Sequence, residues 1–201
     1  MIRRAILSVA VLLSLAACTS MRESQPGRTA TEQLLFSVAA ERAAEQLALN
    51  IPDDTKVFVD AAYVEGTDSK YLLSTIRDRV LRRGGALVDD KANAELVIEP
   101  RLGAISVDRK VMRVGTPDFE IPIPMTGGFP FPEITLFKRD RQQGVIKIAL
   151  TSYDPKTGAL VQSLDPVYGF SHRTQWGAML FFFWTTNDLM PDGEGEDWVD
   201  S

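Results

Sequence analysis

The sequence predicts a single α/β (α+β) domain, in which a mixed β-sheet carries two main helices. Three observations support this prediction: helical periodicity in residues 31–49 and again after Asp68, a nearly continuous apolar run over 56–64 between them, and several strand-like segments after residue 86. Helices that alternate with strands before a run of strands are typical of a mixed sheet. We therefore expect an αβαβ core followed by a C-terminal β-hairpin and further strands.

The composition restricts the kinds of site that the chain can build. It has 201 residues, is 45% hydrophobic and 24% charged, and contains one cysteine and one histidine. A single cysteine cannot form an internal disulfide, and with one histidine it cannot complete a zinc site. The net charge of −5 argues against nucleic acid as a partner. We expect no cofactor and no metal.

The first helix and strand have clear boundary signals. Thr29 and Glu32 have the spacing of a capping box at the start of the helix predicted over 31–49, and Pro52 follows its end. The segment 56–64 (KVFVDAAYV) is apolar, β-branched or aromatic at nearly every position. Such a run predicts a central strand that is covered on both faces.

The second helix is predicted to begin at Asp68 and to stop at Gly84-Gly85, where glycine can adopt a left-handed conformation. Cations favour the negative end of a helix dipole, and four arginines crowd the last turns of this helix: Arg77, Arg79, Arg82 and Arg83. They form either a solvated face or a contact with an anionic lipid or polymer.

The remaining strands follow from alternation and turn signals. Residues 86–88 form a short strand, and 95–108 a longer one in which the apolar positions change parity at Gly103, which predicts a bulge. Strands are also expected over 133–138 and 144–153. The turn sequence Asp154-Pro155-Lys156-Thr157-Gly158 predicts a β-hairpin over 144–164.

The N-terminus has the features of an export signal. Arg3 and Arg4 precede an uncharged stretch over 5–17, which is shorter than the roughly 20 residues that a transmembrane helix needs. The following Leu15-Ala16-Ala17-Cys18 resembles the lipobox of bacterial lipoproteins. That resemblance implies a signal peptide over 1–17, cleavage before Cys18, acylation of Cys18 with palmitate-type chains, and a tether over 18–28. The alternative is an ordinary signal peptide with an incidental cysteine.

The lipoprotein resemblance also implies a location. Thr19, rather than aspartate, after the lipidated cysteine suggests delivery to the outer membrane, where the protein would face the periplasm, with the inner membrane as the alternative. We then expect one periplasmic domain over 29–186. The acidic, glycine-containing segment 187–201 is expected to be a disordered tail.

The order of elements carries a second resemblance. A helix, a strand, a helix ending in Gly-Gly and then ALVDDKANAELVIEPRLGAIS resemble periplasmic lipoproteins with an αβαβ core. The curli-secretion channel lipoprotein and the penicillin-binding-protein activator lipoproteins are of that kind. By overall arrangement the chain resembles an uncharacterised bacterial lipoprotein family with a domain of unknown function. This resemblance implies the fold and assigns no functional residue.

A proline-rich segment over 113–132 is the main candidate for a binding surface. Its five prolines predict an extended loop or a sheet edge, because proline cannot donate a backbone hydrogen bond. Apolar residues alternate with the prolines and form the candidate docking loop: Phe119, Ile121, Ile123, Met125, Phe129 and Phe131. The segment either packs across its own domain as a belt or docks onto an envelope protein, a lipid or the membrane face.

The C-terminal region contains two aromatic patterns. Tyr168, Phe170, His172, Thr174 and Trp176 occupy alternate positions and should line one face of a strand. The run AMLFFFW over 178–184 is too short to span a bilayer as a helix. It is predicted to be a covered core strand or the start of a buried helix, in preference to a tip that inserts into a membrane.

The sequence points to no catalytic site. His172 is the only histidine, Ser171 should lie on the opposite face of the strand, and the Gly-x-Ser-x-Gly elbow is missing. We therefore expect a non-enzymatic envelope lipoprotein, anchored in the lipid bilayer through Cys18, that acts as a binding or assembly component for an envelope protein partner. The alternative is a homo-oligomeric secretion-channel subunit, and an envelope hydrolase is the least favoured reading.

Overall fold

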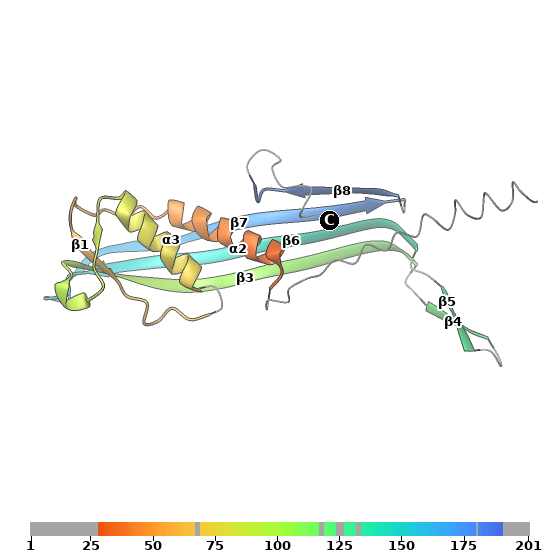
Figure 1. The fold of residues 1–201 in the computed structure, drawn as a ribbon, viewed down its shortest axis with the longest axis horizontal. Helices are drawn as coiled ribbons and strands as arrows, with labels where there is room; N and C mark the ends of the chain where they lie inside the picture. Colours follow the sequence, from red (N-terminus) through yellow and green to blue (C-terminus); the bar gives the residue numbers. More distant parts are fainter. Residues whose placement is uncertain are drawn as a thin grey trace, which may run out of the picture.

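The computed structural model describes residues 28–66, 69–116, 119–123, 127–131, 134–179 and 181–190. Two helices, α2 (Ala30–Glu45) and α3 (Ser69–Arg82), lie on one face of a six-stranded sheet (Figure 1). The sheet strands are β1 (Lys56–Val59), β2 (Ala86–Leu87), β3 (Leu96–Thr116), β6 (Ile134–Tyr153), β7 (Leu160–Ala178) and β8 (Phe182–Asn187). The predicted α/β class, with a mixed sheet and two main helices, is confirmed.

The sheet has the strand order β2-β1-β3-β6-β7-β8. β1 pairs in parallel with both β2 and β3, whereas β3, β6, β7 and β8 pair antiparallel. Parallel neighbours need a crossover, and α3 supplies the one between β1 and β2. A 3-10 turn, η1 (Lys91–Asn93), connects β2 to β3. The αβαβ core and the antiparallel strands that follow it are therefore as expected.

α2 begins with the predicted capping box. The Thr29 hydroxyl accepts a hydrogen bond from the backbone N–H of Glu32, and the Glu32 carboxylate accepts one from the N–H of Thr29. The helix ends at Glu45, four residues before the predicted end at 49. The apolar pattern continues past the helix because Leu47 and Leu49 are buried in the core in a non-helical conformation.

α2 packs directly onto β6 and β7 because small residues meet at the contact. A Cβ at Gly144 would lie 2.5 Å from the carbonyl oxygen of Leu35, so a larger residue there would push the helix away. Gly169 and the buried Ser171 lie under the same helix. The contact surface of α2 consists of alanines that are almost fully buried: Ala39, Ala40, Ala43 and Ala44. The alanine-rich composition of α2 thus serves close packing as well as helix propensity.

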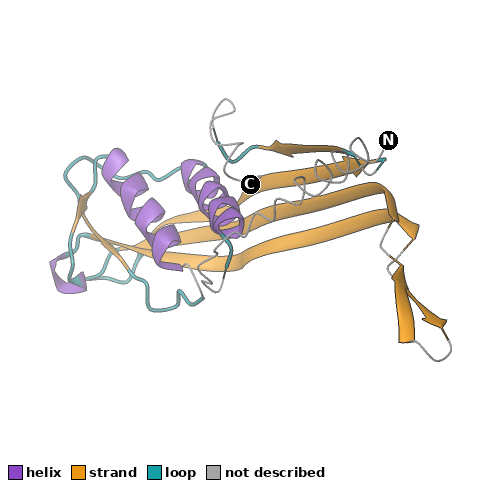
Figure 2. Cartoon of the chain, turned by 45° about the vertical axis from the view of Figure 1, so that its right-hand side comes forward, coloured by secondary structure: helices purple, strands orange, loops and turns teal. Residues whose placement is uncertain are grey.

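The hydrophobic core lies between the two helices and one half of the sheet. Leu72, Ile76 and Val80 of α3 point into it, and Ile146 and Ile148 of β6 form its floor. The helices cover only one end of the long strands, the end at which β1 and β2 lie (Figure 2). The core residues of β3 and β6 come from that half of the sheet.

β1 is shorter than predicted and is not covered on both faces. It ends at Val59 instead of residue 64, and Val57 and Val59 are buried whereas Lys56 is exposed. Beyond it the side chain of Asp60 accepts a hydrogen bond from the N–H of Ala62, which turns the chain away from the sheet. Both helices lie on one face, so neither of them covers the other face of β1.

Two of the long strands differ in length from the prediction. β3 extends to Thr116, and its register shifts between Leu102 and Ala104, which confirms the bulge at Gly103. β6 is one continuous strand where two were predicted, because residues 139–143 pair with β3 on one side and β7 on the other. The predicted β-hairpin is confirmed, with β6 and β7 joined at the turn over 154–159.

The proline-rich segment forms a small hairpin of its own. β4 (Phe119–Ile123) and β5 (Gly127–Phe131) pair antiparallel in a separate two-stranded sheet. In such a hairpin each strand is an edge, where proline is tolerated. The hairpin lies beyond the end of β3 and β6 (Figures 1 and 2), so it does not cross the helix-covered half as a belt.

Strands β3, β6 and β7 continue well past the helices to what we call the distal end of the sheet. The distal end comprises residues 111–116 of β3, 135–138 of β6, 176–178 of β7, and β8. Figures 1 and 2 show that neither helix reaches it. Within the described residues, no helix covers either face of the sheet there.

The prediction of a covered core strand or buried helix over 178–184 is wrong. Ala178 ends β7, and residues 182–184 begin β8, an outer strand at the distal end. Phe181, just before β8, is 83% exposed, and Phe182 and Phe183 in β8 are 63% and 72% exposed. No described element packs on this strand, because both helices lie over the other half of the sheet.

The predicted terminal segments fall mostly outside the described residues. The signal peptide over 1–17, Cys18 and all of the tether except Arg28 lie there, as do residues 191–201 of the predicted tail. The fold extends beyond the predicted domain end at 186, because Leu189 is buried. Within the described part of the chain, no helix has the length and apolarity to cross a membrane.

Candidate functional site

The face of the sheet opposite the helices is a candidate surface, and we call it the uncovered face. Gly144, Gly169 and Ser171 face α2, so their neighbours along each strand face away from it. Strand pairing places the following side chains together on the uncovered face: Asp108, Lys110, Met112, Val114, Phe137, Arg139, Arg141, Lys147, Tyr168, Phe170, His172, Thr174, Trp176, Phe182 and Trp184. The predicted alternation of Tyr168 through Trp176 along one strand face is confirmed.

Aromatic rings and cations are paired on the uncovered face. The rings of Trp176 and Trp184 stack with centroids 6.0 Å apart, and the guanidinium of Arg139 lies 4.8 Å from the centroid of the Trp176 ring. Tyr168 and Phe170 stack in the same way at 6.2 Å, and the Lys147 ammonium lies 5.4 Å from the Tyr168 ring. Cation–π contacts of this kind hold both the ring and the cation at the surface.

The same face carries a local excess of positive charge. Over residues 104–114, 137–149 and 168–178 its charged side chains are one aspartate and four cations: Asp108, Lys110, Arg139, Arg141 and Lys147. The chain as a whole has a net charge of −5. The uncovered face is therefore positive on a negative protein, which favours an anionic binding partner.

On the helix side of the sheet, an ion pair lies beyond the Gly144–Ser171 row, toward the distal end. The guanidinium of Arg109 forms two hydrogen bonds with the Asp140 carboxylate, and a third contact joins its Nε to the second oxygen at 3.2 Å. Asp140 is 2% exposed because Arg109 covers it. The hydrogen bonds from Arg109, assisted by its charge and those of Lys138 and Arg113, lower the pKa of Asp140.

A groove of about 360 Å³ lies at β7 and β8 at the distal end. Its wall includes Lys138, Gly177 and Phe183. Glycine at 177 makes room for the Phe183 ring, because a Cβ there would lie 3.0 Å from the ring edge. The groove thus combines an aromatic wall with one cation.

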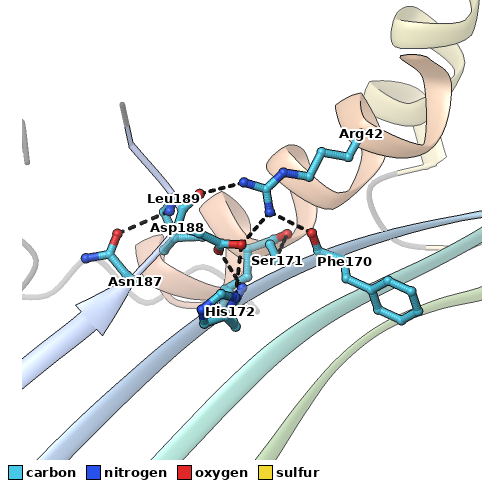
Figure 3. Close-up of polar contacts among 8 residues, drawn as sticks. Arg42, Phe170, Ser171, His172, Asn187, Asp188 and Leu189 are labelled. Atoms are coloured by element: carbon cyan, nitrogen blue, oxygen red, sulfur yellow. Dashed lines mark hydrogen bonds and ion pairs between the residues drawn. The ribbon is translucent and has the colours of Figure 1, made fainter. Parts of the chain in front are cut away.

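A polar cluster joins α2 to the sheet and to the segment after β8 (Figure 3). Arg42 of α2 donates hydrogen bonds to the carboxylate of Asp188 at 2.5 Å, to its backbone oxygen at 2.8 Å, and to the carbonyl of Phe170 at 2.7 Å. His172 Nδ1 lies 2.9 Å from the same Asp188 carboxylate, and the backbone N–H of His172 donates to it at 2.7 Å. The cluster fastens three elements together.

The cluster lacks the geometry of a nucleophilic site. The hydroxyl of Ser171 is buried on the helix side of β7 and donates a hydrogen bond to the carbonyl of Leu35 at 2.5 Å, as its predicted opposite orientation to His172 requires. His172 and Asp188 form a pair, but within the described part of the chain the nearby Ser171 hydroxyl bonds to Leu35 and not to His172. Among the described residues, no three His, Cys, Asp or Glu side chains lie close enough to hold a metal ion.

Two of the arginines at the end of α3 form hydrogen bonds or ion pairs with neighbouring residues of the same chain. Arg79 donates to the backbone oxygen of Glu45 at 2.6 Å, and Arg82 pairs with Asp78 at 2.6 Å. A second groove, of about 400 Å³, lies between the helices next to these residues. There Tyr71 donates to Glu41, and this hydrogen bond raises the pKa of Tyr71 to about 12. These contacts favour the solvated-face reading of the arginines.

The site residues predicted from the sequence do not come together in one place in the structure. Cys18 and Met125 lie outside the described residues. The other five docking-loop positions are in the β4–β5 hairpin, where Phe119 pairs with Phe131 and Ile121 with Phe129. Sequence reasoning missed Arg42 and Asp188, because a helix residue and a residue in a predicted tail give no pattern that would link them.

Comparisons with known proteins give the family of the chain. No curated protein matches it. Residues 13–180 match a family of unknown function, DUF6655. This match covers most of the chain, from the apolar N-terminal stretch to the end of β7. The protein therefore belongs to the DUF6655 family of unknown function.

Proposed function

We propose that this protein is an envelope lipoprotein, anchored in a membrane through Cys18, that acts as a non-enzymatic binding or assembly component. The lipobox-like residues before Cys18 support the anchor, and Thr19 after it suggests the periplasmic face of the outer membrane. The observation that carries the binding role is the long free edge of β3. A sheet edge with unpaired backbone groups is a ready site for another strand.

The free edge follows from the pairing of β3. Its outer side pairs with β1 only at residues 96–98, and none of the described strands pairs with that side over 99–116. Ile98 directs its backbone oxygen to that side, where it accepts from Asp60 N–H, so alternation directs the backbone nitrogen of Pro100 outward as well. Proline blocks pairing only at that one position. The following sixteen residues keep an edge that a partner strand could join.

In-cell photo-crosslinking tests the binding role. A photoreactive amino acid at Val111, on the helix side of the free edge, should give a crosslinked product of discrete mass. The same amino acid at Leu81, an exposed position on α3, serves as the matched control and should give none. Equal products from both positions, or none from Val111, would contradict a partner on this edge.

A second candidate function is an oligomeric secretion-channel subunit. The observation that favours it is that the sheet ends in free edges on both sides at the distal end, β3 on one and β8 on the other. Two different edges on one chain allow copies to join head to tail and to close into a ring. Native mass spectrometry of the detergent-extracted protein distinguishes the candidates, because a monomer rules out the channel subunit.

A further inference from the structure

We propose that the uncovered face of the distal end lies against the lipid bilayer, with its aromatic side chains at the boundary between headgroups and acyl chains. This inference rests on the proposed membrane anchor and adds a second membrane contact to it. The contacting surface, which we call the distal apolar face, consists of Met112, Val114, Phe137, Trp176, Phe182 and Trp184.

Strand pairing collects these side chains into two adjacent rows. One row across the four strands is Met112, Arg139, Trp176 and Trp184, and the next is Val114, Phe137, Ala178 and Phe182. All but Arg139 are apolar. Met112 is 48% exposed and Val114 is 54% exposed, so the rows form a surface rather than a core. An apolar patch spanning four strands marks an interaction site.

The other face of the same rows is more polar. Its first row is Val111, Asp140, Gln175 and Thr185, and its second is Arg113, Lys138, Gly177 and Phe183. Apart from Val111 and Phe183, the side chains there are charged or polar, so the two faces of the distal end differ in polarity. A structure with one apolar and one charged face suits the plane of a membrane interface, where one side meets acyl chains and the other meets water.

The residue types on the distal apolar face are those that membrane interfaces select. Trp176 and Trp184 are stacked, and their amphipathic rings favour the headgroup level of a bilayer. Arg139 lies over Trp176, where its guanidinium can reach lipid phosphates while its carbon stem remains on the apolar surface.

Charge on the adjoining part of the uncovered face favours an anionic bilayer. Lys110 and Arg141 share the row next to Met112, and Lys147 lies further along β6. Basic side chains beside a membrane are attracted to the surface when the lipids are anionic. An apolar protein partner would not need basic residues beside the apolar patch, whereas an anionic bilayer would attract them. We therefore propose a lipid bilayer as the binding partner of this face.

The position of the predicted tether is consistent with this contact. The N-terminal end of α2 points toward the distal end, because Leu35 lies over Ser171 while Ala39 lies over Gly169 (Figure 1). From the Ser171 row to Ala178 the sheet extends about 23 Å. Cys18 precedes Arg28 by ten residues, which span at most about 35 Å. Because α2 begins on the opposite face of the sheet, the tether would have to pass around a sheet edge for acyl chains on Cys18 and the distal apolar face to enter the same bilayer.

Tryptophan fluorescence can test the contact directly. Two of the three tryptophans, Trp176 and Trp184, are on the distal apolar face, and W198F removes the third. The mature W198F protein would be extracted in detergent and reconstituted into phosphatidylethanolamine–phosphatidylglycerol vesicles, with and without bromine on the acyl chains. We expect a blue-shifted emission and a loss of intensity in the brominated vesicles.

Paired variants identify the surface responsible. In the W198F background, V114S with F182S removes two exposed apolar side chains from the face and should abolish the quenching. Y63S with L81S removes two equally exposed side chains elsewhere and should leave the quenching unchanged. K110Q with R141Q should reduce quenching in the anionic vesicles, whereas R82Q with R83Q, at the C-terminal end of α3, should not.

Flotation of the same vesicles at high salt measures the acyl anchor separately. Flotation with quenching supports both claims, and flotation without quenching overturns the membrane contact while the anchor stands. Quenching at low salt without flotation at high salt supports the contact and overturns anchoring at Cys18. Neither signal, or quenching that the V114S/F182S pair leaves intact, overturns the contact.

Discussion

Gly169 of β7 and Ala39 of α2 are in backbone contact. A Cβ built on Gly169 would lie 1.8 Å from the Ala39 carbonyl oxygen and 2.8 Å from the backbone nitrogen of Ala43. Neither atom can move without moving the helix. α2 can therefore lie this close to the sheet only because residue 169 is glycine and has no side chain. Because Arg42 and Gln46 of the same helix also donate to carbonyls of β7, this contact sets the position of the polar cluster.

We predict that Gly169→Ala destabilises the fold by about 2–3 kcal/mol, because the added methyl group overpacks a contact between rigid elements. Urea unfolding followed by circular dichroism measures the change. Gly103→Ala is the control, since its added methyl meets only the flexible Lys147 side chain. A similar loss in both variants would mean that the effect is one of backbone conformation and not of the contact with α2.

Replacing Asp140 by asparagine should remove a pH-dependent contribution to stability. The pKa of Asp140 is lowered in the folded state, so the carboxylate stabilises the fold above its unfolded pKa of about 3.9 and loses this effect as the pH falls through the folded value. Asp140→Asn should therefore cost about 1–2 kcal/mol at neutral pH, a modest value because Arg109 is largely exposed.

The difference between wild type and Asp140→Asn should then shrink in acid. Denaturant unfolding of both proteins at neutral pH and near pH 3 measures it. A difference that is the same at both pH values would contradict a charge-dependent role for Asp140.

Substitution of Arg42 should release the segment after β8. Arg42→Met keeps most of the apolar stem and removes the hydrogen bonds to Asp188 and Phe170, at a cost of about 1–2 kcal/mol. Limited proteolysis should cut near residues 187–190 faster than in the wild type. Arg82→Met, which removes an exposed pair with Asp78, should leave that rate unchanged.

His172→Gln should leave the biological activity of the protein intact. The backbone N–H of residue 172 still donates to Asp188, and glutamine can also donate from its side chain. Complementation of a deletion strain by the variant is the measurement. Loss of complementation by a stable, correctly located variant would favour the hydrolase reading, since His172 is the only histidine.

Patterns within single elements predicted much of this fold. The capping box at Thr29, the parity change at Gly103 and the turn after Asp154 each depend on neighbouring residues, and the structure confirms all three. Residues 139–143 have no such pattern, because arginine, aspartate and glutamine occupy both faces. They form part of β6 only because two partner strands supply the pairing, which no local pattern reveals.

The candidate surface was harder to predict because burial depends on where the helices end. The run over 178–184 is apolar enough for a core strand, and its composition cannot show that both helices stop short of it. The cluster of Arg42, His172 and Asp188 joins positions up to 146 residues apart. Contacts at such separation appear only once the chain has folded.

Mass spectrometry of the N-terminal peptide of the membrane-extracted protein tests the central claim most directly. If Cys18 is the anchor, the peptide begins at Cys18 and carries the mass of its acyl chains, and Cys18→Ser yields no acylated peptide. An N-terminus at any other residue, or an unmodified Cys18 in the membrane fraction, would contradict the account.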